Sequence, residues 1–439
     1  MAYVPVAFIL AGMTAYTVLA GADFGAGLWT LLAFGGSSGA RLIRDEARHA
    51  MGPVWEANHV WLVFVLVVAW TAYPVAYGSI ASTLAAPLLI AAIGIIFRGA
   101  AYALRGVADR SRSAEYLFAL SSVLTPFALG TAIGAIAVGR VPVGNAAGNP
   151  VTSWLNPASV LIGALAVVFS GYLAAVYLAA DSLRHAGGAR PARTVDDAAA
   201  GAEEAVAGSG AGAGADDRAL ADAFRRRALA AGLVSGGLAL AGLLVMRHSG
   251  LNLTHGAALA LVCVSAAAGL ATLLLCWRYR FELARVTAAL AVAAVVVGWA
   301  AGQAPRFLPG LTVTQAAASR STLVALVIAV ACGAVVLVPA LALLFTLYLR
   351  GRLDTPEHPA PEDSVRVAAS SAPGAGGTAA AVEGRAASSA VRVWGGAAGA
   401  GLAAGAGLLV FADASWAHLL GVACLVLCAV CVFRLTATD

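Results

Sequence analysis

The sequence has no lysine and few charges of either sign. All 27 basic residues are arginine, and together with the excess of alanine and glycine this indicates the coding bias of a GC-rich genome, to which we assign no mechanistic role. Only 11% of the residues are charged and 61% are hydrophobic, whereas soluble domains have about 25% charged residues. This composition excludes an ordinary soluble domain and predicts an all-α polytopic membrane protein. The net charge of +5 does not indicate nucleic-acid binding, because the arginines form no basic stripe.

Cysteine is also scarce, and its six positions all lie in apolar segments. The last three, Cys424, Cys428 and Cys431, share one helix face, which could indicate a metal site. No histidine or carboxylate joins that face, so we favour small apolar packing residues. A secretory signal is not expected, because the N-terminus lacks a basic region and the apolar run from Pro5 is too long.

Long apolar runs are what the sequence has in abundance. Runs of about 18 or more apolar residues mark membrane-spanning helices. Nine of them lie in residues 1–350, which we expect to form one nine-helix transmembrane bundle: 5–34, 54–76, 80–104, 117–138, 157–180, 227–246, 256–276, 286–302 and 321–349. Two shorter runs, 396–411 and 416–433, predict an extra pair of helices within 396–439. Segments 182–226 and 351–395 are rich in small and acidic residues, so we expect a flexible cytoplasmic loop and a low-complexity cytoplasmic linker.

The arginines predict how the bundle is oriented. If the N-terminus is outside and the spans alternate, 22 arginines fall in cytoplasmic segments, with Arg227 counted at the edge of its span, four fall in external ones, and Arg98 lies inside a span. Arginine favours the cytoplasmic side of a membrane. We therefore expect an external N-terminus and a cytoplasmic C-terminus.

Four charged or titratable residues fall inside the first three predicted spans. Their distances from the span ends, at 1.5 Å rise per residue, put all of them in the cytoplasmic half: Asp23, Glu56, His59 and Arg98. Glu56 and His59 share one helix face with Trp55 and Asn58, because residues three or four apart are neighbours on a helix. Such charges are tolerated in a membrane when they pair with one another.

Three interpretations of this polar group stay open at this point. In the first, Glu56 and Asp23 carry protons through a hydrated relay with His59, and Arg98 adjusts their pKa values. In the second, Arg98 neutralises Asp23 or Glu56, and the group only locks three helices together. The third is a substrate site. Haem ligation by His59 is disfavoured, because no second histidine lies well inside one of the nine main spans.

Residues 299–312, with the sequence WAAGQAPRFLPGLT, stand at the predicted outer end of the eighth span. Trp299 and Gln303 are one turn apart, and two prolines follow them. We expect this stretch to form a rigid outer cap.

Four stretches together resemble one known family. They occur in a fixed order: GADFGAGLW (21–29), GPVWEANHVWLV (52–63), FRGAAYALR (97–105) and WAAGQAPRFLPGLTVTQAAA (299–318). They are similar to the second subunit of cytochrome bd-type quinol oxidases, over about residues 5–350. The second and fourth stretches are the specific ones.

The resemblance implies a subunit of a respiratory terminal oxidase that oxidises membrane quinol and reduces dioxygen to water. It implies two b-type haems and a third d- or b-type haem, all held by a haem-bearing partner subunit. It also allows a small accessory subunit in the complex. It also implies a bacterial plasma membrane, surrounding lipids and quinone, and a cytoplasmic proton path to which this chain contributes. The family's proton-path acids correspond to Asp23 and Glu56, its arginine to Arg98, and a tryptophan near an oxygen route to Trp61.

The chain departs from the family pattern at several positions. Many relatives have an acid where this chain has Ala20 and Gly21, and another where it has Ala103. The proton path is therefore expected to depend more on Glu56 and His59. A non-catalytic assembly or scaffold subunit, and a proton-coupled transporter, are the alternative functions.

Overall fold

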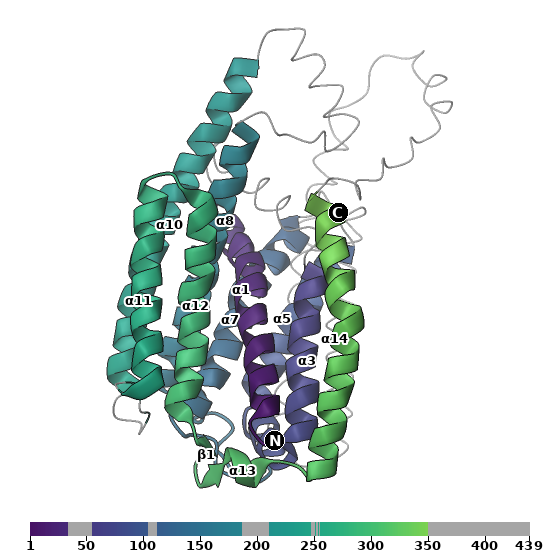
Figure 1. Ribbon diagram of the computed structural model, residues 1–439. Coiled ribbons are helices and arrows are strands. Elements are labelled where there is room, and N and C mark those ends of the chain that lie inside the picture. Colours follow the sequence, from purple (N-terminus) through teal and green to yellow (C-terminus); the bar gives the residue numbers. More distant parts are fainter. Residues whose placement is uncertain are drawn as a thin grey trace, which may run out of the picture.

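The computed structural model describes residues 1–33, 55–103, 112–186, 210–246, 251, 253 and 255–349. Within these ranges the chain is a bundle of long, roughly parallel and antiparallel helices with one small hairpin at its base (Figure 1). The predicted helices in 396–439 and the linker 351–395 lie outside the described residues. So does the middle part, 187–209, of the predicted loop.

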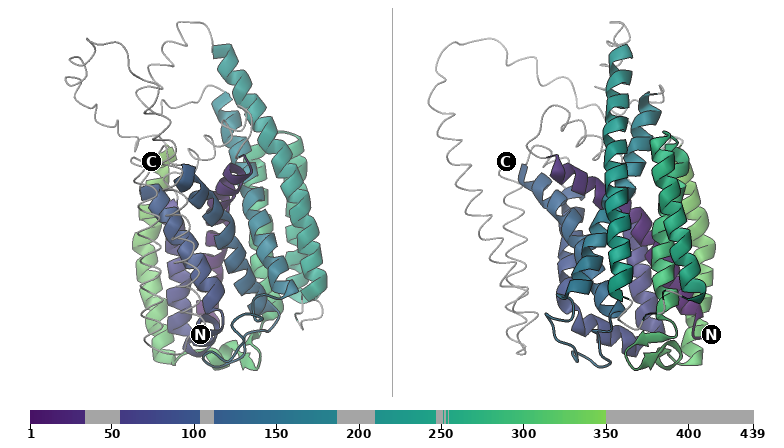
Figure 2. Two further views of the ribbon diagram at one scale, coloured as in Figure 1. Left: turned by 180° about the vertical axis from the view of Figure 1, so that it is seen from behind. Right: turned by 90° about the vertical axis from the view of Figure 1, so that its left-hand side faces the viewer.

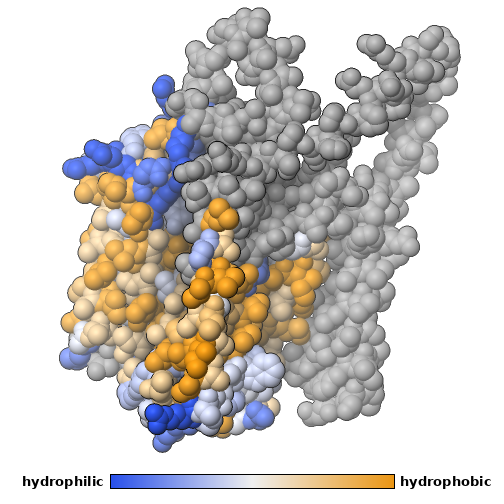
Figure 3. Space-filling model, turned by 45° about the vertical axis from the view of Figure 1, so that its right-hand side comes forward, coloured by the Kyte–Doolittle hydropathy of each residue, from blue (hydrophilic) through white to orange (hydrophobic). Residues whose placement is uncertain are grey.

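Among the residues that the structure describes, seven helices are long and apolar enough to cross a membrane. They are α1 (Val4–Leu32), α7 (Arg112–Ala137), α8 (Pro157–Ala186), α10 (Gly210–Met246), α11 (Gly256–Trp277), α12 (Phe281–Gln303) and α14 (Arg320–Leu349). Figure 3 shows an apolar belt between hydrophilic ends, as expected of a multi-pass membrane protein.

The predicted second and third spans form three helices instead of two. They are α3 (Trp55–Ala72), α4 (Pro74–Thr83) and α5 (Ala85–Ala103), and α4 meets α5 at an angle of 81°. The first break falls before Pro74, because proline has no N–H to continue the preceding helix and is favoured in a first turn. Counting α4 and α5 as one span gives eight candidates, and α3 is shorter. The ninth span therefore stays a prediction.

The prediction of a flexible loop over 182–226 is wrong at both ends. Helix α8 continues to Ala186 and α10 begins at Gly210. Leu220 and Phe224 of α10 are buried in a core with residues of α8 and α12, and alanine-rich sequence has a high helix propensity. At 1.5 Å per residue, the 37 residues of α10 extend well past a hydrocarbon layer of about 30 Å. Figures 1 and 2 show this projecting end.

The predicted cap is an ordered hairpin, and we call its side of the bundle the hairpin end. Strands β1 (Arg306–Leu308) and β2 (Leu311–Thr312) pair antiparallel, and the short helix α13 (Val313–Ala316) follows. The backbone N–H of Ala318 donates to the carbonyl of Ala72 at 2.8 Å. The rings of Tyr73 and Phe307 lie 4.9 Å apart, and the Tyr73 hydroxyl donates to the carbonyl of Ala2. The cap thus joins α14, the α3–α4 break and the chain start.

The opposite side of the bundle is the arginine-rich end, formed by the last turns of α8, the first turns of α10 and the α11–α12 turn. It carries Arg184, Arg225, Arg226, Arg227, Arg278, Arg280 and Arg285. The arginine count predicts that this end faces the cytoplasm.

Candidate functional site

A buried ion pair joins α1 to α5. Arg98 donates from Nε to Asp23 Oδ2 at 3.0 Å and from Nη2 to Asp23 Oδ1 at 2.6 Å. The side chains are 0% and 2% exposed. This bidentate geometry is the strongest arrangement of an arginine–carboxylate pair. The pairing agrees with the depth argument made from the sequence.

Two further guanidinium N–H groups are also used. Nη2 donates to the carbonyl of Asp23 at 2.8 Å, and Nη1 donates to Ser122 Oγ on α7. The cation lies over two rings, 5.0 Å from the centroid of Phe24 and 4.2 Å from that of Phe118. Cation–π contacts of this kind strengthen when the charge is desolvated. The pair therefore holds α1, α5 and α7 at one depth.

Two glycines of the GADFGAG stretch allow this approach. A Cβ at Gly27 would lie 2.0 Å from Ser122 Oγ and 3.3 Å from Arg98 Nη1. A Cβ at Gly25 would lie 1.8 Å from the backbone oxygen of Ser170 on α8. No larger residue fits at either position without moving a helix, since real Cβ contacts of that length do not occur. Helix α1 is thus held between α7 and α8 by residues without side chains.

Helix α3 runs antiparallel to α1 and brings the other predicted residues alongside. A Cβ at Gly12 would lie 3.5 Å from the carbonyl of Trp61, and the rings of Tyr16 and His59 are 6.3 Å apart in an edge-on arrangement. Continuing this register places the backbone of Glu56 opposite the turn that precedes Asp23. The side chains of Trp55 and Glu56 lie outside what the structure describes.

Asn58 is fully buried, at 0% exposure. Neither its amide nitrogen nor its amide oxygen has a hydrogen-bond partner among the described residues. Leaving such a group unpaired costs about 1–3 kcal/mol. Trp61 packs against a cluster formed by Tyr16, Ala20 and Phe24, and its place near an oxygen route stays a prediction.

The comparisons with known proteins can be set beside this geometry. The family "Cytochrome bd terminal oxidase subunit II" matches residues 1–348. The chain belongs to this family. The matched part holds the buried pair, α3 and the hairpin cap.

Two relatives show how far the likeness extends. The cytochrome bd ubiquinol oxidase subunit 2 of Bacillus subtilis (strain 168) is 31% identical over 115 residues, which are 26% of this chain and 33% of that protein. The match thus spans one third of the length of that relative. A chain in the structure of bd oxidase from Geobacillus thermodenitrificans aligns with a TM-score of 0.59 at 20% identity, covering 79% of this chain and 98% of that chain. The second likeness shows a shared fold.

Sequence reasoning missed three polar residues around the pair of this subunit II chain. They are Tyr16 on α1 and Ser122 and Thr125 on α7, all buried. The signal was available, because Ser122 and Thr125 are polar and share one face of an apolar helix at a spacing of three. Only the charged residues of the first three spans had been compared by depth.

The described part of this subunit II chain does not suit a haem or a metal ion. Within the described spans, His59 is the one histidine whose side-chain surroundings the structure describes. Its ring packs edge-on to the ring of Tyr16. The same residues contain no group of three or more histidine, cysteine or carboxylate side chains that could hold a metal. We therefore derive no chemical step through a cofactor held by these residues.

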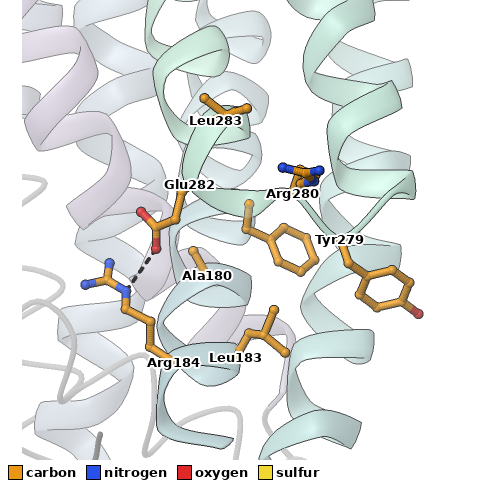
Figure 4. Close-up of a pocket in the computed structure, with 8 residues that line it drawn as sticks. Ala180, Leu183, Arg184, Tyr279, Arg280, Glu282 and Leu283 are labelled. Carbon is orange, nitrogen blue, oxygen red and sulfur yellow. Dashed lines mark ion pairs between the residues drawn. The ribbon is translucent and has the colours of Figure 1, made fainter. Parts of the chain in front are cut away.

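A second charged cluster lies at the arginine-rich end, between α8 and the start of α12 (Figure 4). Arg184 pairs with Glu282 at 3.1 Å, and Arg285 pairs with Asp181 at 2.6 Å. Arg184 and Glu282 border an open pocket of about 390 Å³ whose apolar wall includes Leu183. This network ties α8 to α12 where both are accessible to solvent.

The α11–α12 turn continues this cluster toward α10. The Tyr279 hydroxyl donates to Asp222 Oδ1 at 2.6 Å, and this hydrogen bond raises the pKa of Tyr279 above its usual value. Arg225 lies over the same ring, 4.4 Å from its centroid. The projecting turns of α10 are thereby anchored to the end of α11.

Proposed function

We propose that this chain is subunit II of a respiratory bd-type oxidase that oxidises membrane quinol and reduces dioxygen to water. The family match over residues 1–348 carries this proposal. The Bacillus subtilis relative is named as a ubiquinol oxidase subunit, which supports the substrate class. The haems, two b-type and a third of d or b type, would belong to a haem-bearing subunit I, with which this chain would pack.

Within that complex, this chain would help to deliver protons from the cytoplasm through Glu56 and His59, with Asp23 and Arg98 beside them. The geometry of the buried pair supports a division of labour. Every guanidinium nitrogen of Arg98 donates to Asp23, to Ser122 or to the backbone. Protonating Asp23 would remove the negative charge with which this buried guanidinium pairs, which is costly. We therefore assign the mobile proton to Glu56 and His59 and a fixed charge balance to the pair.

The orientation and location follow from the same proposal. The arginine-rich end would face the cytoplasm of a bacterial plasma membrane, and the hairpin end with the N-terminus would face outward. In this orientation, Glu56 lies in the first turn of α3, at the cytoplasmic end of that helix. Residues 1–350 would form the oxidase domain, with 351–395 as a linker and 396–439 as an added helix pair.

Replacing the carboxyl group of Glu56 tests the proton role. We expect Glu56→Gln to lower quinol-driven oxygen consumption by about 100-fold, the size of effect typical of a lost proton-transfer group. Turnover is measured on the purified complex, and its haem spectrum reports assembly. Glu282→Gln is the matched control, because this glutamate is 65% exposed at the arginine-rich end, and its turnover should match wild type.

Two outcomes would count against the proposal. Wild-type oxygen consumption in a normally assembled Glu56→Gln complex would remove Glu56 from the proton path. Purification of the wild-type chain without any haem-bearing partner would favour the scaffold or transporter alternatives instead. Proton flux into liposomes that contain the chain alone would identify the transporter.

A further inference from the structure

Three polar side chains close to the buried pair have no visible hydrogen-bond partner. The Tyr16 hydroxyl, both amide atoms of Asn58 and the Thr125 hydroxyl are buried and have no partner among the described residues. The exposed fractions of these residues are 9%, 0% and 0%. Nearly all buried polar groups in native proteins are hydrogen-bonded to protein or to ordered water. Each of the three therefore needs an explanation.

The three groups come from different helices but lie at similar depth. The ring of Tyr16 contacts that of His59, the neighbour of Asn58 in the chain. Tyr16 also interacts electrostatically with Asp23 and Arg98. The cluster that surrounds Tyr16 includes Leu62 and Ile95. Asn58 lies one turn from Leu62 on the same face of α3.

Thr125 reaches the same layer from α7. Its hydroxyl would lie 2.2 Å from a Cβ at Gly94, so it approaches the α5 backbone directly beside Ile95. It is also three residues from Ser122, which accepts from Arg98. The layer thus lies between α1, α3, α5 and α7, about one to two helical turns from the pair on its hairpin side.

We infer that Tyr16, Asn58 and Thr125 bind a small cluster of buried water molecules between these four helices. Water is the partner that suits them, because it is small and can both donate and accept, and buried waters make about three hydrogen bonds to otherwise unpartnered polar groups. An amide, a phenol and an alcohol give both kinds of group without adding charge. Nothing larger is required.

The functional part of the inference rests on the proposed proton role of Glu56 and His59. The backbone of Glu56 and the ring of His59 are at the depth of this layer. A water oxygen that accepts a proton from one side can release a different proton to the other, so charge and atoms balance without any side chain moving. Asn58, Tyr16 and Thr125 are then positioning residues for water.

Radiolytic labelling in ¹⁸O-enriched water tests the site directly on the intact complex, because hydroxyl radicals formed from bound water oxidise the nearest side chain. We expect Tyr16 to be labelled at least several-fold faster than Tyr73. Tyr73 is the matched control, since it is 0% exposed and its hydroxyl already donates to Ala2. Equal, low labelling of both tyrosines would overturn the inference.

The variant Asn58→Leu gives an independent readout, because leucine has nearly the same volume but no polar atom. In a dry site, this change removes an unpaired amide, so the melting temperature of the complex should rise and turnover should not change. In a hydrated site, leucine displaces water from Tyr16 and Thr125. We then expect no gain in melting temperature and a loss of turnover smaller than the roughly 100-fold loss expected for a proton-transfer group itself, with Asn58→Gln retaining more activity than Asn58→Leu.

These outcomes are separable from those for Glu56. Rapid labelling of Tyr16 together with wild-type turnover in Glu56→Gln would keep the water site and discard the proton role. A raised melting temperature in Asn58→Leu together with slow turnover in Glu56→Gln would discard the water site and keep the proton role.

Discussion

Two ion pairs in this protein use the same chemical groups in opposite surroundings. Arg98 and Asp23 are 0% and 2% exposed, and every guanidinium nitrogen has an acceptor. Arg184 and Glu282 meet at 3.1 Å with side chains that are 47% and 65% exposed. The first pair lies among three helices in the apolar belt, and the second borders an open pocket (Figure 4).

The contrast teaches that the surroundings, more than the distance, decide what a pair contributes. A buried charge that loses its partner cannot turn to water, so breaking a buried pair costs about 3–5 kcal/mol. An exposed pair is already hydrated and contributes about 0–1 kcal/mol. The buried pair should thus control assembly, and the exposed cluster should adjust it slightly. Three substitutions test this difference.

The largest effect is expected from Arg98→Leu. The change removes the guanidinium that pairs with the buried carboxylate of Asp23, and it also removes the donor to Ser122. We expect destabilisation of about 3–5 kcal/mol, seen as a large loss of assembled complex and a lower melting temperature in detergent.

The double variant Asp23→Leu with Arg98→Leu is the control for this prediction. Removing both charges should recover much of the lost stability, because an apolar pair of similar volume can replace a buried ion pair. A double variant that is as unstable as Arg98→Leu would show that packing of the arginine side chain, rather than charge balance, explains the loss.

An intermediate effect is expected from Gly25→Ala. The added Cβ would lie 1.8 Å from the Ser170 backbone oxygen, so α1 and α8 must separate, and overpacking of this kind costs about 1–3 kcal/mol. The matched control is Gly236→Ala on α10, where nothing lies within 4 Å of the new atom. Thermal unfolding of the two complexes should differ by several degrees. Equal melting temperatures would mean that α1 and α8 separate freely and do not fix the depth of the pair.

The smallest effect is expected from Arg184→Gln. Its partners Asp181 and Glu282 are 29% and 65% exposed, and Arg285 still pairs with Asp181 at 2.6 Å. We expect a change below about 1 kcal/mol that shrinks further when melting is repeated in high salt. A loss of stability as large as that of Arg98→Leu would contradict the difference between the buried and the exposed pair.

The buried pair could be predicted because depth is a simple count along a helix. Asp23 and Arg98 fall at one level in the first and third predicted spans, although the count of depth alone left Asp23 and Glu56 both open as the partner of Arg98. The role of Ser122 could not be found in that way, because it depends on how α7 rotates about its axis. The same rotation depends on Gly27, whose contact with α7 has no signature in a single sequence.

Errors arose where composition was used in place of packing. The start of α10 is as rich in alanine and glycine as a linker, yet Leu220 and Phe224 are enough to bury one face of it. The break at Tyr73 lies inside an apolar run, and only Pro74 marks it. Hydropathy reports which residues avoid water, and it does not report where a helix bends.

The cap at the hairpin end has a consequence for the order of synthesis. The carbonyl of Ala2 accepts from Tyr73, whose ring packs on Phe307, and Ala72 accepts from Ala318. The start of the chain is therefore bonded to Tyr73, and the surroundings of Tyr73 are completed only by residues that leave the ribosome more than two hundred codons after it. Helix α14, the last described helix, packs mainly against α3 at the edge of the bundle.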